Sequence, residues 1–440
     1  MAYQGSGSMP MERASKIGHI KMIQDPHLQR MLAEFESSGP TSGDPIGERS
    51  GHIDLTQPSS IQYVIAVDGG EAIIPNQIRS EKRVGLISVA ALLLRMSDIE
   101  EMKNNPILDP RDLASRLKDS IWSNATMLPM AGIRLPGQSV KESIRKAVDS
   151  TLHFTGLYPT LQFLISREWD ASFVMGSGDA PYFFCRQCGG KIYVPKSTLH
   201  FRCSDCNHPH TLSDYLGIGE ESAEEWTREE TVKALRNTLE TLTVFHFLRV
   251  WRNQPDILSQ ILFVKDGPLM LRAGLYRLVD SIRAYIAHLH RQNIPFFLVG
   301  VEKSGEMVNH LDEIKTQLPD PGDFFLPTVP YIVEQIDGYA FNPQTYRNRV
   351  QYGAKAAVRL GPNHILPLNI PTPEFLLYPT PGDLIGFEES VVLLSGLISY
   401  RYENAIIPLV LANEHASISQ RPSGNILESF INRFITASAG

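Results

Sequence analysis

The sequence predicts an α/β protein, and three observations lead to this prediction. Short apolar runs separated by turn residues lie between residues 61 and 94, which is typical of hairpins in one sheet. From residue 260 to residue 301, a strand, a helix and a second strand follow one another, as in an α/β layer. All four cysteines of the chain lie within residues 185–206, where they interrupt the main pattern as an insertion.

Length and charge limit the organisation of the chain and its partners. The 440 residues are enough for two or three domains, or for one large domain with an insert. The net charge is −7, so a surface that binds nucleic acid would be local or shared with a partner. No run of about 18 apolar residues suggests a membrane span, and the first residues do not read as a signal peptide. We therefore expect no membrane association and a cytoplasmic location.

The first half of the chain begins with a polar segment. Residues 1–60 are rich in Gly, Ser and Pro, and we expect an N-terminal arm with one helix at 26–36. Helices dominate from residue 110 to residue 167, where 140–153 has helical periodicity. The strands expected before these helices are 61–67, 71–74 and 84–94.

The second half alternates between helices and strands. A long helix is expected at about 222–252, and the chain closes with a helix at about 425–437. The strand, helix and strand between them are 260–264, 276–292 and 295–301. Further short β segments are expected at 331–334, 356–359 and 391–394.

The four cysteines form two Cys-x2-Cys pairs, Cys185 with Cys188 and Cys203 with Cys206. This spacing is typical of a tetrahedral thiolate site for Zn²⁺. The short strands 191–194 and 199–202 then belong to a zinc ribbon inserted at 180–212. Because four thiolates fill the coordination shell, we expect a structural site. Two surface disulfides are the alternative, and the composition and spacing disfavour them. The nearby His208 and His210 are expected on the ribbon surface.

Two acidic residues occupy equivalent places at the ends of predicted strands. Asp68 follows an apolar strand and precedes two glycines, and Asp266 follows a second strand and precedes Gly-Pro. If both strands lie in one sheet, the two carboxylates can converge on Mg²⁺ or Mn²⁺, which can hold a phosphodiester for attack by water. Asp-Gly is also a common turn signal, so an ordinary turn is the alternative interpretation.

Several segments, taken in order, resemble the motifs of the NurA nuclease family. The motifs are Val67-Asp68-Gly69-Gly70, Phe263-Val-Lys-Asp266-Gly-Pro-Leu269 and Leu298-Val-Gly-Val-Glu-Lys303-Ser304. The segment 404–419, which contains Pro408, Ala412 and His415, resembles the last motif of the family. The resemblance spans about 61–420, apart from the zinc insert.

The resemblance implies an RNase H-like core, with a mixed sheet and flanking helices, in a nuclease domain at 61–440. It implies hydrolysis of DNA phosphodiesters that depends on Mn²⁺ or Mg²⁺. It also implies a homodimer that works with a HerA-type hexameric ATPase, either in DNA end processing or in defence against foreign DNA.

The resemblance also assigns roles to single residues. Asp68 and Asp266 match the two acids that bind metal, and Glu240 best matches an acid on the helix before the second motif. Lys303 would contact the scissile phosphate, and His415 would complete the site as a ligand or a proton carrier. Glu302 is an alternative ligand to Glu240.

Three departures from the family pattern support a second hypothesis. Gly70 and Pro268 replace serines, and Asn413 is a candidate for the position where the family has His or Asp, which would leave His415 off the site. The second hypothesis is a non-catalytic adaptor that docks on the motor and binds DNA or protein through the zinc ribbon. A zinc-ribbon transcription or RNA-processing factor is a third interpretation, which only the cysteines support.

Overall fold

A computed structural model describes most of the chain, which divides into two compact units, 1–45 and 46–440. The described residues are 25–34, 49–74, 82–104, 120–130, 132–173, 180–196, 198–219, 228–344, 346, 348, 350–399 and 404–418. In the first unit they form helix α2, Pro26–Glu34, where a helix was expected. The expected helix at 425–437 and the first residues of the helix expected at 222–252 lie outside the described residues. Among the described helices, none is both long and apolar enough to cross a membrane.

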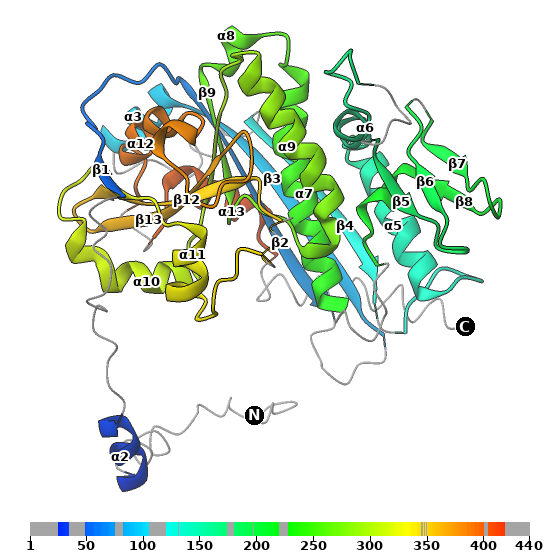
Figure 1. The fold of residues 1–440 in the computed structure, drawn as a ribbon, viewed down its shortest axis with the longest axis horizontal. Coiled ribbons are helices and arrows are strands. Elements are labelled where there is room, and N and C mark those ends of the chain that lie inside the picture. The colour runs from blue at the N-terminus through cyan, green and yellow to red at the C-terminus, as the bar shows by residue number, and fades with distance from the viewer. Residues whose placement is uncertain are drawn as a thin grey trace, which may run out of the picture. The chain divides into compact units, whose positions relative to one another are not determined.

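The second unit is organised around a nine-stranded mixed sheet (Figure 1). The strand order is β1-β11-β12-β13-β10-β9-β2-β3-β4. Strands β2, β9 and β10 run parallel to one another, and all other neighbours are antiparallel. The strands are β1 (Ser50–His52), β2 (Tyr63–Ile74), β3 (Val84–Arg95), β4 (Ile121–Pro129), β9 (Ile261–Asp266), β10 (Phe297–Val301), β11 (Asp323–Phe325), β12 (Gly353–Gly361) and β13 (His364–Pro371).

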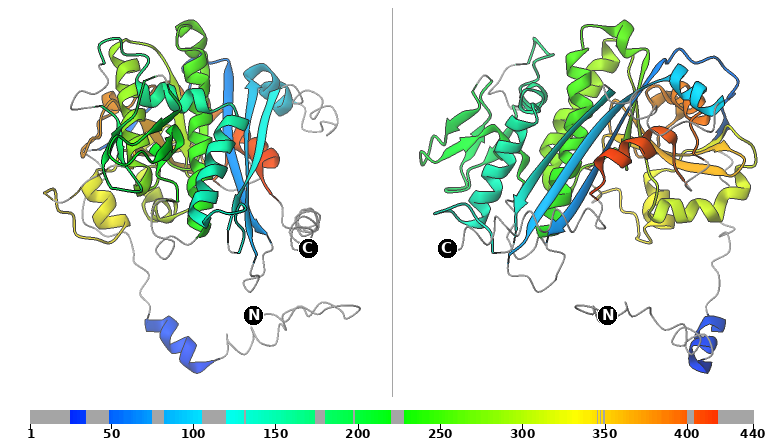
Figure 2. Two further views of the ribbon diagram at one scale, coloured as in Figure 1. Left: turned by 90° about the vertical axis from the view of Figure 1, so that its right-hand side faces the viewer. Right: turned by 180° about the vertical axis from the view of Figure 1, so that it is seen from behind.

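Helices cover both faces of this sheet. Helices α7 and α9 pack on one face (Figure 1), and α13 lies across β2 on the other (Figure 2). The described helices of this unit are α3 (Met96–Asn104), α5 (Val140–Phe154), α6 (Tyr158–Ser166), α7 (Arg228–Val250), α8 (Pro255–Leu258), α9 (Tyr276–Arg291), α10 (Glu306–Ile314), α11 (Val329–Tyr331), α12 (Phe387–Ser395) and α13 (Ile407–Ala416). The mixed sheet with helices on both faces confirms the predicted α/β fold class.

The two faces of the sheet form two separate hydrophobic cores. Successive side chains of a strand point to opposite faces, and β2 follows this rule. Ile65 and Val67 pack in the core beneath α7 and α9, whereas Val64 and Ala66 pack in the core beneath α12 and α13. The same alternation determines on which face of the sheet each polar side chain of β2 and β9 lies.

Three features expected in the first half of the chain differ in the structure. The strands expected at 61–67 and 71–74 form one continuous strand, β2, without a turn at the two glycines. Within the span expected to be helical, β4 is a strand at one edge of the sheet. Only Leu128 of its nine residues is buried, and the residues Ser123, Asn124 and Ala125 at its centre have low strand propensity, so its sequence gives a weak strand signal. Strand β1 also pairs with β11, so residues 50–52 of the expected arm join the sheet.

Two short strands expected in the second half are helical. Residues 331–334 belong to α11 and the π-helical turn that follows it, and 391–394 lie within α12. A short buried apolar run cannot be assigned to a strand or a helix from periodicity alone. The elements expected at 84–94, 140–153, 260–264, 276–292, 295–301 and 356–359 are confirmed.

The cysteines lie in two small hairpins between α6 and α7. Strand β5 (Tyr182–Phe184) pairs with β6 (Lys191–Tyr193), and β7 (His200–Arg202) pairs with β8 (Pro209–Thr211). Both strands predicted for the ribbon are present, each with its own partner. Buried residues on the inner side of the hairpins join the core beneath α7 and α9.

Candidate functional site

Asp68 and Asp266 lie on neighbouring parallel strands, on the same face of the sheet. Val67 of β2 is in register with Lys265 of β9, so the two aspartates follow at adjacent positions. The alternation of side chains places both carboxylates on the face that α13 covers. The side chain of Asp68 is 1% exposed and that of Asp266 is 25% exposed, so the pair opens to solvent on the Asp266 side.

Lys303 connects the two carboxylates. Its Nζ lies 2.8 Å from Oδ1 of Asp266 and 3.6 Å from Oδ2 of Asp68. The lysine follows β10, which runs parallel to β9, so three adjacent strands bring these residues together. The structure thus unites three side chains that the sequence predicted for one site.

Helix α13 contributes Asn413 to the same cluster. Its Nδ2 donates a hydrogen bond of 2.9 Å to Oδ2 of Asp68, and the N–H of Gly69 donates one of 2.7 Å to Oδ1. His415 is exposed two residues further along the helix, and its side chain makes no hydrogen bond or ion pair with a described residue. Residues two apart on a helix do not share a face. The residue of α13 that reaches the site is therefore Asn413, and the expected position of His415 in the site is corrected.

The electrostatics of Asp68 favour a cation. Burial raises the pKa of Asp68, and the negative charge of Asp266 raises it further. The charge of Lys303 and the hydrogen bonds from Asn413 and Gly69 act in the opposite direction but do not restore the ordinary value. Two carboxylates that share one pocket repel each other, and a divalent cation between them would remove this repulsion.

Glu240 approaches the same motif from the opposite face of the sheet. This residue of α7 is buried and pairs with Lys265 at 3.1 Å and with Arg236 at 2.7 Å. Burial raises the pKa of Glu240, whereas the two cations lower it. Arg236 also pairs with Glu71 and donates a hydrogen bond of 3.1 Å to the carbonyl of Gly69. Glu240 thus neutralises two cations and anchors α7 to β9, while Arg236 anchors α7 to β2. This differs from the ligand role that the resemblance implies.

The two glycines after Asp68 allow helices to approach β2 from both faces. A Cβ at position 69 would lie 2.5 Å from Oε1 of Glu240, and a Cβ at position 70 would lie 2.4 Å from the carbonyl oxygen of Ala416. Both distances are below ordinary van der Waals contact. The departure from serine at Gly70 therefore has a structural reason, because α13 passes close to the strand there.

Glu302 is directed away from the two aspartates. It is buried and forms an ion pair with Lys355 and accepts a hydrogen bond of 2.7 Å from Nδ2 of Asn369. Lys355 of β12 therefore neutralises the charge of Glu302, and Asn369 of β13 fixes the orientation of its carboxylate. The structure does not favour Glu302 as an additional ligand.

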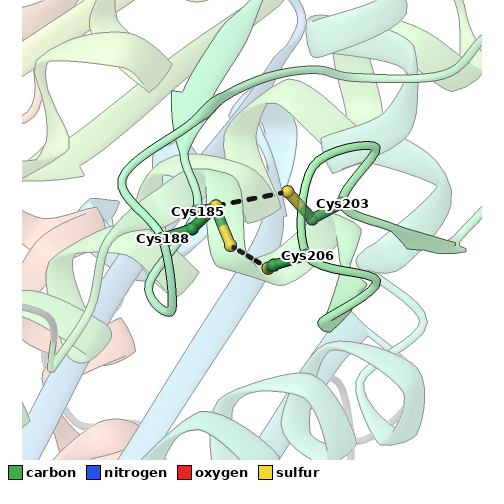
Figure 3. Close-up of side chains that lie close together, drawn as sticks. All are labelled: Cys185, Cys188, Cys203 and Cys206. Carbon is green, nitrogen blue, oxygen red and sulfur yellow. Dashed lines mark hydrogen bonds between the residues drawn. The ribbon is translucent and has the colours of Figure 1, made fainter.

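The four cysteines form a second, separate cluster (Figure 3). Their sulfur atoms all lie within 4.8 Å of one another. Cys185 and Cys188 come from the loop between β5 and β6, and Cys203 and Cys206 come from the loop between β7 and β8. Four thiolates converging from two knuckles fit a tetrahedral zinc ion, whose natural ligands are sulfur and nitrogen. Among the described residues, no other group of three or more His, Cys, Asp or Glu side chains lies this close together.

A buried histidine contacts the cysteine cluster. Nε2 of His210 lies 3.4 Å from Sγ of Cys185, and Nδ1 lies 3.0 Å from Oδ2 of Asp214. Burial favours a higher pKa for Asp214, but hydrogen bonds from His210 and Arg145 bring the pKa well below its ordinary value. The expectation that His210 lies on the surface is wrong, since it is 1% exposed. A polar residue beside a metal ligand often orients that ligand, and the sequence signal was the adjacency of His210 to Cys206.

The oxygen donors at Asp68 and Asp266 also fit a metal. Mg²⁺ and Mn²⁺ prefer oxygen ligands, and Mg²⁺ is commonly held by one or two carboxylates together with substrate phosphates and water. The two aspartates supply such a pair, with Asn413 and the backbone of Gly69 orienting Asp68. A cavity of about 890 Å³ between β4, α5 and the β7–β8 hairpin contains neither aspartate, and we assign it no part in this chemistry.

Comparisons with known proteins find similar structures but no matching family model and no matching curated protein. The NurA nuclease from Sulfolobus solfataricus is 10% identical over 97% of this chain and 98% of that chain, with a TM-score of 0.36. A structure of NurA bound to dAMP and manganese is 12% identical over 96% and 98%, with a TM-score of 0.28. Endonuclease V of Ciona intestinalis in complex with DNA is 10% identical over 88% and 95%, with a TM-score of 0.25.

Proposed function

We propose that this protein is a DNA nuclease that hydrolyses phosphodiester bonds with Mn²⁺ or Mg²⁺. One observation carries the proposal: the carboxylates of Asp68 and Asp266 converge at adjacent parallel strands, with Lys303 between them. A buried acid pair is unfavourable unless cations neutralise it. Fold maintenance does not require such a pair at an open edge, whereas phosphodiester hydrolysis with a divalent cation uses carboxylates to hold that cation.

Each residue of the cluster has a role that follows from its position. Asp68 and Asp266 would hold the cation, and the bound cation would polarise a phosphate oxygen. Asn413 and the N–H of Gly69 fix the orientation of Asp68. Lys303 is 28% exposed at the mouth of the site, so its ammonium group can bind a phosphate oxygen of the substrate. Glu240 holds α7 against β9 through Lys265 and acts as a positioning residue.

The proposed organisation and partners rest on the sequence resemblance. Residues 61–440 form the nuclease domain, with the zinc ribbon at 180–212 as an insertion and the preceding residues as an arm. A homodimer would work with a HerA-type hexameric ATPase in DNA end processing or antiviral defence in the cytoplasm. A net charge of −7 is compatible with this arrangement, because a motor that holds the DNA relieves the nuclease of supplying that affinity.

A second candidate function has a specific observation in its favour. Asn413, a neutral amide, fills the place of α13 beside Asp68 where the family resemblance leads us to expect an acid or a histidine. One ligand charge fewer weakens a divalent-cation site. A non-catalytic adaptor that docks on the motor would tolerate this change.

Cleavage assays distinguish the two candidates. Linear and circular DNA would be incubated with the protein in Mn²⁺, with and without the partner ATPase. The proposal predicts cleavage by the wild type and none by the isosteric Asp68→Asn/Asp266→Asn variant, with the zinc content of both unchanged. Tight complex formation with the ATPase and no cleavage by the wild type under any of these conditions would instead favour the adaptor.

A further inference from the structure

The outer face of the β5–β6 hairpin carries three aromatic side chains and one lysine. Phe183 and Ile192 point inward and are buried in the main core. Their neighbours along each strand alternate to the opposite side. The four residues of this outer face, called the aromatic face below, are Tyr182, Phe184, Lys191 and Tyr193.

The rings of the aromatic face are close together and partly open to solvent. Tyr182 lies 5.7 Å from Phe184 and 6.3 Å from Tyr193, measured between ring centroids. Phe184 is 50% exposed and Tyr193 is 45% exposed. Because the inner side of the hairpin already supplies its buried contacts, the fold does not require three aromatic rings on the outer side. Exposed aromatic clusters of this kind mark interaction sites.

Lys191 adds a positive charge to these rings. Its Nζ lies 3.8 Å from the ring centroid of Tyr182 and 4.9 Å from that of Tyr193. Lys191 makes no ion pair with a described acidic residue, so the rings hold its ammonium group without neutralising it. A ligand that fits must therefore offer both a flat surface and a negative charge.

The charge of the surrounding segment also favours an anionic ligand. Residues 180–212 contain four Lys or Arg residues and a single acidic residue, Asp205, whereas the whole chain has a net charge of −7. Four thiolates with one Zn²⁺ carry a charge of −2, so with zinc bound this segment sums to +1 (4 − 1 − 2). Arg186 also pairs with Asp214, just outside the segment. The hairpins are thus slightly basic in an acidic protein. Proteins that bind single-stranded nucleic acid combine aromatic rings, on which bases stack, with cations near the phosphates.

We propose that the aromatic face binds unpaired bases of single-stranded DNA. A base stacks on Phe184 or on a tyrosine ring, and Lys191 binds the adjoining phosphate. The proposal rests on the proposed function in one respect, since the bound strand is taken to belong to the nuclease substrate. Binding itself requires neither Asp68 nor Asp266, so it can be measured separately from cleavage.

Fluorescence anisotropy with a labelled oligo-dT tests this proposal on the full-length, zinc-loaded protein without added divalent metal. Base–aromatic stacking contributes about 1–3 kcal/mol per base, so Phe184→Ala/Tyr193→Ala should weaken binding at least about 5-fold. Lys191→Gln should weaken binding and reduce the slope of log affinity against log salt by roughly 0.7. Tyr339→Ala is the matched control, because Tyr339 is 72% exposed outside the hairpins.

Several outcomes would overturn the proposal. The proposal is wrong if the wild type does not bind oligo-dT, or if Phe184→Ala/Tyr193→Ala binds it as tightly as the wild type does. It is also wrong if Tyr339→Ala weakens oligo-dT binding as much as the double alanine variant does. If that variant binds oligo-dT normally but no longer associates with the ATPase, the aromatic face contacts protein instead. Unchanged zinc content and an unchanged thermal unfolding midpoint establish that the variants are folded. Oligo-dT binding by a wild type that never cleaves DNA would refute the nuclease and leave this inference intact.

Discussion

Replacing Gly70 with alanine tests how the site is assembled. The new Cβ would lie 2.4 Å from the carbonyl oxygen of Ala416, whereas ordinary contact begins at 3.4 Å, so α13 must withdraw by about 1 Å. Overpacking of this kind costs about 1–3 kcal/mol. A shift of that size would also stretch the 2.9 Å hydrogen bond from Asn413 to Asp68 beyond bonding distance. We therefore expect Gly70→Ala to lose both stability and cleavage activity.

Gly382→Ala is the control for this variant. A Cβ at position 382 meets nothing within 4 Å, so this change should be neutral or stabilise the protein by up to about 1 kcal/mol. Urea unfolding followed by circular dichroism would be measured for both variants and the wild type. If Gly70→Ala unfolds at the same urea concentration as Gly382→Ala, the close packing of α13 on β2 at Gly70 is contradicted.

Three further predictions concern charges at the two clusters. The raised pKa of Asp68 means that the folded protein keeps this proton to a higher pH than the unfolded chain does. The stability that the Asp68 proton contributes is greatest at a pH below the ordinary pKa of 3.8, and it is lost as the pH rises through the folded-state pKa. The free energy of unfolding of Asp68→Asn, measured over the same pH range, should not show this decrease. Lys303→Gln should abolish most cleavage while leaving Mn²⁺ affinity equal or higher, since the variant lacks a competing cation; titrating the cleavage rate with Mn²⁺ separates the two effects. His210→Ala should weaken zinc binding by about 10- to 100-fold in a chelator competition, and the exposed His200→Ala should not.

Local patterns in the sequence were sufficient to select the two acids of the candidate site. Asp266 ends β9 as predicted, whereas Asp68 lies inside the longer strand β2 beside that end. The apolar runs therefore located both acids, although the end of the first strand was misplaced. Lys303 followed from the polar end of a third strand and from the resemblance. These predictions needed only the correct strands and their parallel order.

The remaining contacts depend on packing between distant parts of the chain. Asn413 reaches Asp68 across 345 positions, and its choice over His415 depends on the rotation of α13, which no local pattern gives. The pairing of Lys265 with Glu240 had an available signal, since a lysine inside a buried strand needs a buried acid. His210 was misplaced because the ribbon folds its second hairpin against the core.

Binding of Mn²⁺ tests whether Asp68 and Asp266 form the cation site. Zinc-loaded wild-type protein and the Asp68→Asn/Asp266→Asn variant would be titrated with Mn²⁺, and free Mn²⁺ would be followed by electron paramagnetic resonance. If the two aspartates hold the cation, the wild type should bind Mn²⁺ saturably and the variant should not, with the zinc content unchanged in both. Equal Mn²⁺ binding by the two proteins would contradict this assignment, because the converging carboxylates would then not be the cation site.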